Sequence, residues 1–272
     1  MRRPKAWTAW LLMLPWLLFA LTPPLATLLT SIKQPVDAFA VPPVWLFTPT
    51  FAAYKQLWVD EGFSLYLWNS AIVALATVAV SLVLGASAGY ALARYRKTGG
   101  FTLLMVALLF RALPRTAFAL PFYWIARATG LYDTRLILVL VLVAVNQPFT
   151  VWMFRGFFLE IPEEIDEAAM VDGCTRWGAF RRVILPLAMP GAITAGLFTL
   201  LLAYNEFLMP VVLTATRATT LPVAISAFGT EDLRYWTITA AGSVSIALPI
   251  VVVVLICQRY FVRGLAFGAV KG

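Results

Sequence analysis

The chain has 272 residues, of which 61% are hydrophobic and 12% are charged, and its formal net charge is +8. Because an ordinary soluble domain carries about 25% charged residues, this composition excludes an ordinary soluble protein. The chain also has no histidine, no Cys/His metal spacing and no glycine-rich phosphate loop. The sequence therefore assigns no catalytic residue, no metal site and no cofactor to this chain.

Long uncharged stretches predict an all-α integral membrane protein. A helix crosses the hydrocarbon of a bilayer with about 20 residues, and it satisfies its own backbone hydrogen bonds there. Five uncharged stretches are long enough, and a sixth at 98–126 is interrupted by Arg111 and Arg115. We therefore expect residues 1–272 to form one transmembrane domain. Its six spans are predicted at about 8–31, 68–93, 101–126, 135–158, 188–212 and 238–259.

The N-terminus is similar to a secretory signal peptide, because Arg2, Arg3 and Lys5 precede an apolar run. However, the apolar run is longer than a signal core, and no small-residue cleavage site follows it cleanly. We therefore expect the first span to be retained.

The basic residues predict the orientation of the chain in the membrane. With the N-terminus in the cytoplasm and six crossings, thirteen lysines and arginines fall on the inner side and six fall on the outer side. The positive-inside rule favours this arrangement, so both termini are predicted to be cytoplasmic. This topology then accounts for the net positive charge, and we expect membrane lipid but no nucleic acid as a partner.

The inner loop at about 159–187 is acidic and rich in small residues. Pro162 suits the first turn of a helix, and the carboxylates that follow it face the positive end of the helix dipole. Gly173 is placed to end this helix in a left-handed conformation, and Thr175 can cap a second short helix. The sequence therefore predicts two short helices at the cytoplasmic surface.

The charge of the first short helix indicates what it contacts. Ala168 and Ala169 have almost no side chain, so another surface can approach the helix closely. One alternative is a helix that rests on lipid headgroups, but such helices usually present Lys and Arg to anionic lipid. Carboxylates favour a basic groove on a protein instead. We expect the helix to present Glu163, Glu164, Asp166, Glu167 and Asp172 to that groove.

The same loop carries a motif that resembles a known family. The motif reads Glu167-Ala168-Ala169, Gly173, Val183 and Leu185-Pro186, with valine in place of the family's isoleucine. This pattern is similar to the signature of the membrane subunits of ATP-binding-cassette importers. The resemblance implies a type I importer fold, in which the first loop helix couples to a cytoplasmic ATPase. The implied coupling positions are Glu163, Glu167, Ala168, Ala169, Asp172, Gly173, Leu185 and Pro186.

A narrower resemblance extends over nearly the whole chain. The segment 204–207, with tyrosine where tryptophan is more frequent, and the glycine-containing tail at 260–272 are similar to carbohydrate-uptake permeases. The smaller membrane subunit of maltose-type systems is the most similar kind. This resemblance implies that the tail is a second contact with the ATPase, and a frayed chain end is the alternative.

The resemblance also implies an assembly in the bacterial cytoplasmic (inner) membrane. A second homologous permease, two ATPase subunits that hold ATP and Mg, and an extracytoplasmic substrate-binding protein would complete it. The chain itself would have no enzymatic activity. Segments 32–67 and 214–237 are predicted to lie outside the cytoplasm, where they could meet the binding protein. Packing against the helix bundle is the alternative for both segments.

Polar residues at bilayer depth are candidates for the substrate path. An arginine there costs about 2.5–3.5 kcal/mol on insertion scales, so Arg111 should face a wet cavity or the second permease. The other candidates are Arg115, Tyr123, Asn146, Gln147, Tyr204, Asn205 and Glu206. The alternative for Arg111 and Glu206 is an internal ion pair, and the alternative for Tyr123 is an interfacial aromatic belt. We also hypothesise that Arg111 and Arg115 together favour an anionic sugar derivative.

The sequence thus predicts the permease subunit of an ATP-driven, binding-protein-dependent importer that moves a sugar or sugar derivative by alternating access. One alternative is an importer permease for a non-sugar solute, such as an anionic small molecule or a phosphate ester. A second alternative is a secondary transporter, which needs a coupling-ion site and often has inverted repeats. The sequence shows no internal repeat, and a secondary transporter has no use for an acidic docking helix.

Overall fold

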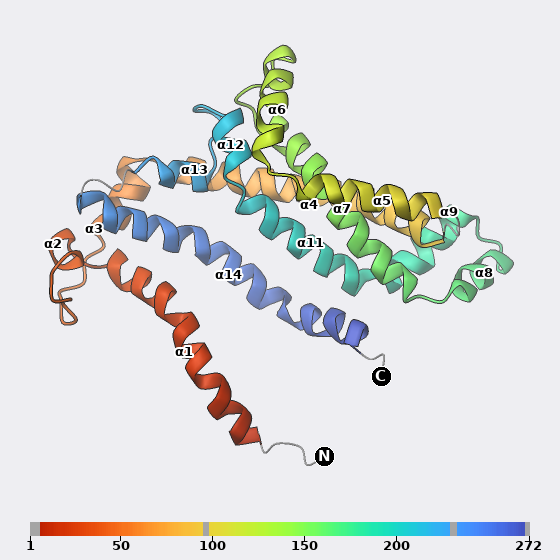
Figure 1. The fold of residues 1–272 in the computed structure, drawn as a ribbon, viewed down its shortest axis with the longest axis horizontal. Helices are drawn as coiled ribbons and strands as arrows, with labels where there is room; N and C mark the ends of the chain where they lie inside the picture. The colour runs from red at the N-terminus through yellow and green to blue at the C-terminus, as the bar shows by residue number, and fades with distance from the viewer. Residues whose placement is uncertain (1–5, 95–97, 229–232, 270–272) are drawn as a thin grey trace. The chain divides into compact units, whose positions relative to one another are not determined.

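The computed structural model of the chain describes residues 6–94, 98–228 and 233–269 (Figure 1). These residues form helices joined by loops, and no β-strand occurs among them, so the predicted all-α class is confirmed. The chain divides into two compact units. One comprises residues 1–65 and 224–249, and the other comprises residues 66–223 and 250–272.

The first unit holds the N-terminal helix and a folded segment after it. Lys33 donates a hydrogen bond to the Val44 carbonyl at 2.7 Å, and the Ser31 and Tyr54 hydroxyls lie 2.9 Å apart. The predicted outer segment 32–67 therefore packs partly on residues of its own unit. The helices of this unit are α1 (Ala6–Ser31), α2 (Pro35–Ala38), α3 (Ala52–Lys55), the π-helical turn η1 (Gln56–Asp60) and the first part of α14 (Leu233–Ala269).

The second unit holds most of the helix bundle and the acidic loop. Its helices are α4 (Ser64–Arg94), α5 (Thr98–Ala112), α6 (Thr116–Ala128), α7 (Arg135–Leu159), α8 (Glu163–Val171), α9 (Arg176–Ala179), the π-helical turn η2 (Phe180–Ile184), α10 (Leu185–Leu187), α11 (Met189–Tyr204), α12 (Leu208–Leu213) and the start of α13 (Leu221–Ser226). The short helices α8 and α9 lie at one end of this unit (Figure 1).

Among the described residues, four helices are long and apolar enough to cross a membrane. They are Trp10–Ser31 of α1, Ser64–Arg94, Arg135–Leu159 and Tyr235–Gln258 of α14. Two bent helix pairs bring the number to six if each pair counts as one span. The exact boundaries of the spans and the cytoplasmic placement of both termini stay predictions.

Several predicted features lie wholly or partly outside the described residues. The inner basic residues Arg2, Arg3, Lys5, Arg96 and Lys97 are among them. The predicted tail at 260–272 continues α14 as far as Ala269, but its side chains are not among those described. Its contact with an ATPase therefore stays a prediction.

The third predicted span, 101–126, is two helices rather than one. The axes of α5 and α6 differ by 94° across a short break (Figure 1). Pro114 lies in this break, has no N–H to continue the helix, and disfavours the helical conformation at the residue before it. The two helices meet at nearly a right angle.

The fifth predicted span, 188–212, is also interrupted. Pro210 would clash with the carbonyl of Glu206 if the helix were continuous. Instead α11 ends, and one carboxylate oxygen of Glu206 accepts hydrogen bonds from the N–H groups of Leu208 and Met209 at 3.2 and 3.4 Å. Glu206 thus caps the new helix α12 and satisfies N–H groups that have no partner within the helix.

Glycines bring two helices very close to α7. A Cβ atom on Gly89 of α4 would lie 2.6 Å from the Cβ of Phe154, and one on Gly191 of α11 would lie 2.4 Å from the ring of Phe157. No other residue leaves room for these contacts, so the backbones of α4 and α11 approach α7 as small residues allow in membrane helix packing.

A buried hydrophobic cluster connects the bundle to the acidic loop. Its aromatic members are Phe154 and Phe158 of α7 and Phe180 of η2, and Ile184 and alanines of α4 and α11 complete it. Because η2 belongs to the loop, part of this loop is core rather than surface.

A second loop of this unit is held by polar side chains. The carboxylate of Asp133 accepts hydrogen bonds from the backbone N–H groups of residues 215–218 at 2.9–3.2 Å. The Asn69 amide donates to the carbonyls of Arg217 and Thr219 at 3.0 and 2.8 Å, and Arg135 donates to the Asn69 oxygen at 2.7 Å. This part of the predicted outer segment 214–237 therefore packs on the bundle, and residues 229–232 lie outside the described part.

Replacing Asp133 with asparagine is expected to weaken this loop in a pH-dependent manner. Partial burial alone would raise the pKa of Asp133, but the four backbone donors lower it to about 2 from the ordinary 3.8. A lowered carboxyl pKa stabilises the fold above pH 4 and loses this effect as the pH falls towards 2. Asparagine tolerates the left-handed backbone of residue 133 (φ 58°). We expect the variant to lose about 1 kcal/mol at pH 7 and little at pH 2, measured by thermal unfolding in detergent. An equal loss at both pH values would contradict this assignment.

Candidate functional site

The acidic helix α8 is bounded as its sequence requires. It begins after Pro162, its first turn holds Glu163, Glu164 and Asp166, and these carboxylates stabilise the positive end of the helix dipole. It ends at Val171, and Gly173 follows the C-cap Asp172 with a φ of +88°, which is strained for any residue with a side chain. The predicted left-handed glycine is thus confirmed.

The segment after α8 turns back towards the bundle. The Thr175 hydroxyl accepts a hydrogen bond from the N–H of Gly178 at 3.1 Å, which confirms the predicted cap of α9. Val183 and Leu185 then pack against the hydrophobic cluster, whereas Pro186 is exposed. The chain bends by 77° between Arg176–Leu187 and α11.

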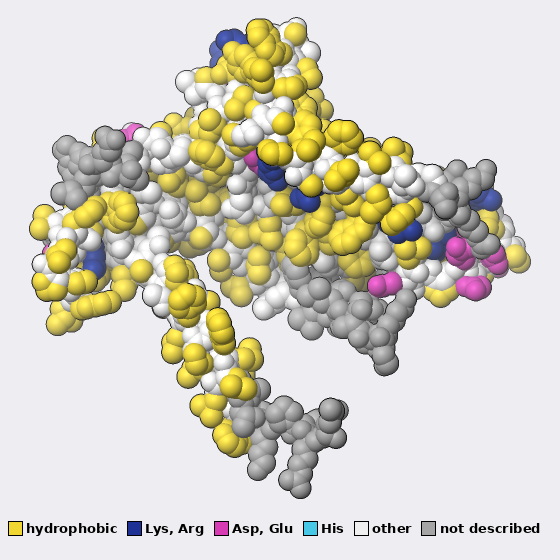
Figure 2. Space-filling view, in the orientation of Figure 1, with side chains coloured by type: hydrophobic (Ala, Val, Ile, Leu, Met, Phe, Trp, Pro, Cys, Tyr) yellow, Lys and Arg dark blue, Asp and Glu magenta, His cyan; other side chains and the backbone are white. Residues whose placement is uncertain are grey.

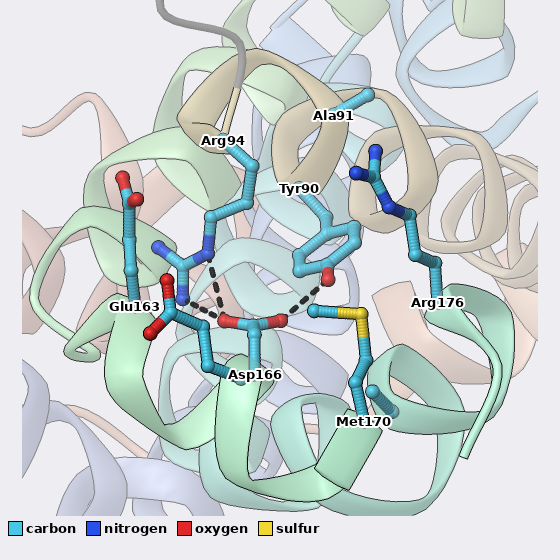
Figure 3. A pocket seen from close by; sticks show the side chains of 9 residues that line it. Tyr90, Ala91, Arg94, Glu163, Asp166, Met170 and Arg176 are labelled. Carbon is cyan, nitrogen blue, oxygen red and sulfur yellow. Dashed lines mark hydrogen bonds and ion pairs between the residues drawn. The ribbon is translucent and has the colours of Figure 1, made fainter. Parts of the chain in front are cut away.

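A buried ion pair fixes α8 to the end of α4 (Figure 3). The Asp166 carboxylate accepts hydrogen bonds from the Tyr90 hydroxyl and, at 2.9 Å, from Nε of Arg94, and Nη2 of Arg94 lies 2.7 Å from the same carboxylate. The Asp166 and Arg94 side chains are only 10% and 16% exposed. We call Tyr90, Arg94 and Asp166 the anchor of α8.

The anchor also reaches the end of α7. Arg94 donates to the carbonyls of Phe158 and Ile161 at 2.9 and 3.1 Å. The Tyr90 ring lies 4.7 Å from the ring of Phe180, measured between centroids, and so joins the hydrophobic cluster. One arginine therefore connects α4, the last turn of α7 and α8.

The structure corrects the predicted orientation of two residues of α8. Asp166 and Ala169 are 7% and 6% exposed and face their own chain, because they lie three residues apart on the inner side of the helix. The expectation that Asp166 and Ala169 face a partner is therefore wrong. The exposed side holds Glu164, Glu167, Ala168, Asp172 and Gly173.

A cavity of about 410 Å³ opens beside the anchor (Figure 3). Glu163, Glu167 and Met170 of α8 line one side, and Arg176 of α9 lines another. Acidic side chains gather at this end of the unit (Figure 2). Within the described ranges no group of three or more His, Cys, Asp or Glu could hold a metal ion. The arrangement suits the docking of a protein surface.

The predicted substrate-path residues divide into two groups. Arg111 and Arg115 line one cavity, together with aromatic residues of α5 and α6. Glu206 is 4% exposed and forms an ion pair with Arg115. The alternative that paired Glu206 with Arg111 is therefore wrong, because the bend after α5 turns Arg115 rather than Arg111 towards α12.

Arg111 has a weaker set of contacts. Its guanidinium lies 4.7 Å from the centre of the Phe149 ring, and its buried Nε has no hydrogen-bond partner. A cation–π contact contributes about 0.5–2 kcal/mol, and a place in the last turn of a helix contributes about 0.3–1 kcal/mol. Together these contributions sum to about 0.8–3 kcal/mol, against an insertion cost of about 2.5–3.5 kcal/mol.

The remaining predicted path residues do not share this cavity. Tyr123 accepts a hydrogen bond from Arg127 at 3.1 Å. Asn146 is fully buried and Tyr204 is 5% exposed, and their polar side-chain atoms have no partner. Gln147 donates to the Ser81 carbonyl at 3.3 Å, whereas Asn205 is exposed at the end of α11. These five residues carry no geometric evidence for a common site.

Sequence reasoning did not find the anchor as a unit. In the sequence, Arg94 is one of the inner basic residues that predict the orientation of the chain, and neither Tyr90 nor Phe180 was singled out. One signal was present, because Tyr90 and Arg94 lie four residues apart at the end of an apolar helix and so share a face. Their partner Asp166 lies more than seventy residues away in the chain, and only the fold brings them together.

These features define a class of protein. The chain is a helical membrane protein, and its acidic loop is fixed to the core on one side and exposed on the other. Residues 81–267 match the model of the family described as "binding-protein-dependent transport system inner membrane component". The chain belongs to this family, and it is thus a multi-pass inner-membrane permease and a non-catalytic subunit of an ABC transporter.

Curated relatives cover most of the chain. It is 42% identical to the trehalose transport system permease protein SugB of Mycobacterium tuberculosis over 83% of both chains. It is 33% identical to the sulfoquinovosyl glycerol transport system permease protein SmoH of Agrobacterium fabrum, over 93% of this chain and 89% of that one. Among solved structures, a subunit of a bacterial ABC transporter involved in the import of the acidic polysaccharide alginate aligns with a TM-score of 0.75 and 23% identity. That alignment covers 93% of this chain and 95% of that chain, and it confirms the importer fold.

Proposed function

We propose that this chain is the permease through which a binding-protein-dependent importer brings a sugar or sugar derivative into the cell. The names of its relatives, which transport trehalose and sulfoquinovosyl glycerol, support a carbohydrate cargo. The observation that carries the coupling role is the anchor of α8, because it makes an exposed acidic helix part of the packed bundle.

The proposed assembly has four kinds of protein. This chain pairs with a second homologous permease, two copies of a cytoplasmic ATPase bind ATP and Mg, and an extracytoplasmic binding protein delivers the sugar. Closure of the ATPase pair moves α8. Since Arg94 ties α8 to α4 and α7, the motion passes to the bundle as a rigid-body rotation and alternates access to the sugar.

The Glu167→Lys variant tests this proposal. Glu167 is exposed, so the variant should fold and insert normally, but a lysine repels a basic groove on the ATPase. We expect uptake into vesicles by the reconstituted complex to fall at least about tenfold, with less ATPase subunit co-purified. The matched control is Glu61→Lys, an equal charge change at an exposed position on the predicted opposite side of the membrane.

Three outcomes would contradict the proposal. Normal uptake by Glu167→Lys would remove the docking role of α8. Uptake driven by an ion gradient without ATP would indicate a secondary transporter. A neighbouring binding protein that binds no sugar in calorimetry would favour the non-sugar importer.

A further inference from the structure

A small cavity lies between α5, α6 and α7 in the second unit. It has a volume of about 150 Å³ and is lined by Arg111, Arg115, Phe110, Phe118, Phe122 and Pro148, among others. Pockets that enclose whole small molecules usually measure about 300–1,000 Å³. This cavity therefore suits one charged group with part of a ring, and its wall combines guanidinium groups with aromatic faces.

The carboxylate nearest to this cavity is already occupied. One oxygen of Glu206 caps α12 through Leu208 and Met209, and the other oxygen pairs with Arg115. Arg115 is therefore neutralised within the chain. The recorded contacts of Glu206 include Arg115 but not Arg111.

Arg111 keeps its positive charge without a carboxylate among its described contacts. The Phe149 ring covers one face of the guanidinium at 4.7 Å, but ring and guanidinium together are still cationic. Its Nε is buried and makes no hydrogen bond. A guanidinium that lines a cavity and has no carboxylate among its described contacts is suited to an anionic group, because its donors can match two oxygens of a carboxylate or a sulfonate.

We propose that Arg111 binds the acidic group of a sugar acid, such as a carboxylate or a sulfonate, while the sugar passes through the permease. The phenylalanines of the cavity pack against the apolar face of the sugar ring. Arg115 stabilises the fold through Glu206 and does not bind the sugar. This inference rests on the proposed function of the chain as a sugar importer and names the charge class of its substrate.

The test uses the complete reconstituted complex with its binding protein, in vesicles of phosphatidylcholine only. Uptake is measured for a uronic-acid disaccharide and for its carboxyl-reduced neutral counterpart, which differ in charge alone. The variants are Arg111→Gln, which removes the charge, and Arg111→Lys, which keeps it. The control is Arg155→Gln, which removes another arginine that stacks on a phenylalanine at 4.7 Å and has an unbonded Nε, but does not line the cavity.

We expect Arg111→Gln to raise KM for the acidic disaccharide by about tenfold or more and to change KM for the neutral one less than about twofold. Arg111→Lys should recover part of the loss. Arg155→Gln should affect both sugars equally or neither.

An equal rise in KM for both sugars in Arg111→Gln, or no rise for either sugar, would overturn the inference. Loss of the second permease during purification of Arg111→Gln would place the anion on that partner. If the wild-type pattern of uptake of the two sugars returns only after anionic lipid is added, the anion that Arg111 binds is a lipid headgroup. Either of these two results would overturn the inference. If wild-type complex takes up neutral sugars alone, the inference fails and the proposed function stands, whereas uptake of no sugar of either charge defeats the proposed function itself.

Discussion

Replacing Asp166 with alanine is expected to abolish uptake and to destabilise the protein. The change leaves the Arg94 guanidinium without its carboxylate in a site where the arginine side chain is 16% exposed. Breaking one side of a buried ion pair costs about 3–5 kcal/mol, and the slight exposure places this case at the lower end. The free energy of unfolding in detergent and uptake into vesicles should both fall, because α8 loses its attachment to α4.

A double variant separates stability from coupling. Arg94→Met with Asp166→Leu replaces the charged pair by apolar residues, which often restores or increases stability. We expect it to recover thermal stability but not full transport, because methionine cannot donate to the carbonyls of Phe158 and Ile161. Full transport by the double variant, or normal uptake by Asp166→Ala, would show that the anchor has no part in coupling.

Replacing Arg115 with alanine is expected to have the second largest effect. The two sides of the ion pair between Arg115 and Glu206 differ in exposure, since the Glu206 side chain is 2% exposed and the Arg115 side chain is 34% exposed. Loss of the arginine leaves a carboxylate in an environment where it cannot be hydrated. Loss of the carboxylate leaves an arginine whose side chain is about one-third exposed on the surface of the chain. Arg115→Ala should therefore cost about 3 kcal/mol, and Glu206→Gln less.

The comparison of these variants measures the role of Arg115. The double variant Arg115→Ala with Glu206→Gln should recover most of the loss in thermal stability, because glutamine still accepts the N–H groups that cap α12. Uptake of acidic and neutral sugars should fall equally in Arg115→Ala. A loss confined to acidic sugars would instead assign Arg115 to the cargo.

The helical class and the approximate regions of the spans were predictable from uncharged stretches alone, because hydrocarbon imposes a minimum length. The left-handed residue at Gly173 and the cap at Thr175 were also predictable, since both depend on neighbours within three residues. The right angle near Pro114 was not predictable, because a proline ends a helix but does not determine the direction of the next helix.

Long-range pairs were beyond prediction for a different reason. The five carboxylates at 163–172 look alike in sequence, and the inward turn of Asp166 depends on an arginine at the end of another helix. Similarly, the sequence offered Arg111 as the ion-pair partner of Glu206, whereas the fold, with its bend between α5 and α6, pairs Arg115 with Glu206. Charges at bilayer depth indicate that a partner exists, but the fold determines its identity.

The two faces of α8 also bear on how such transporters diversify. Because Arg94 holds the end of α7 through main-chain carbonyls, that connection does not depend on which side chains stand at 158 and 161. The outward positions 164, 167 and 168 take no part in it. Under the proposed docking of α8 on an ATPase, substitutions there would match the permease to a different motor protein while the transmission to the bundle stays intact, so one chain design would serve interchangeable ATPases.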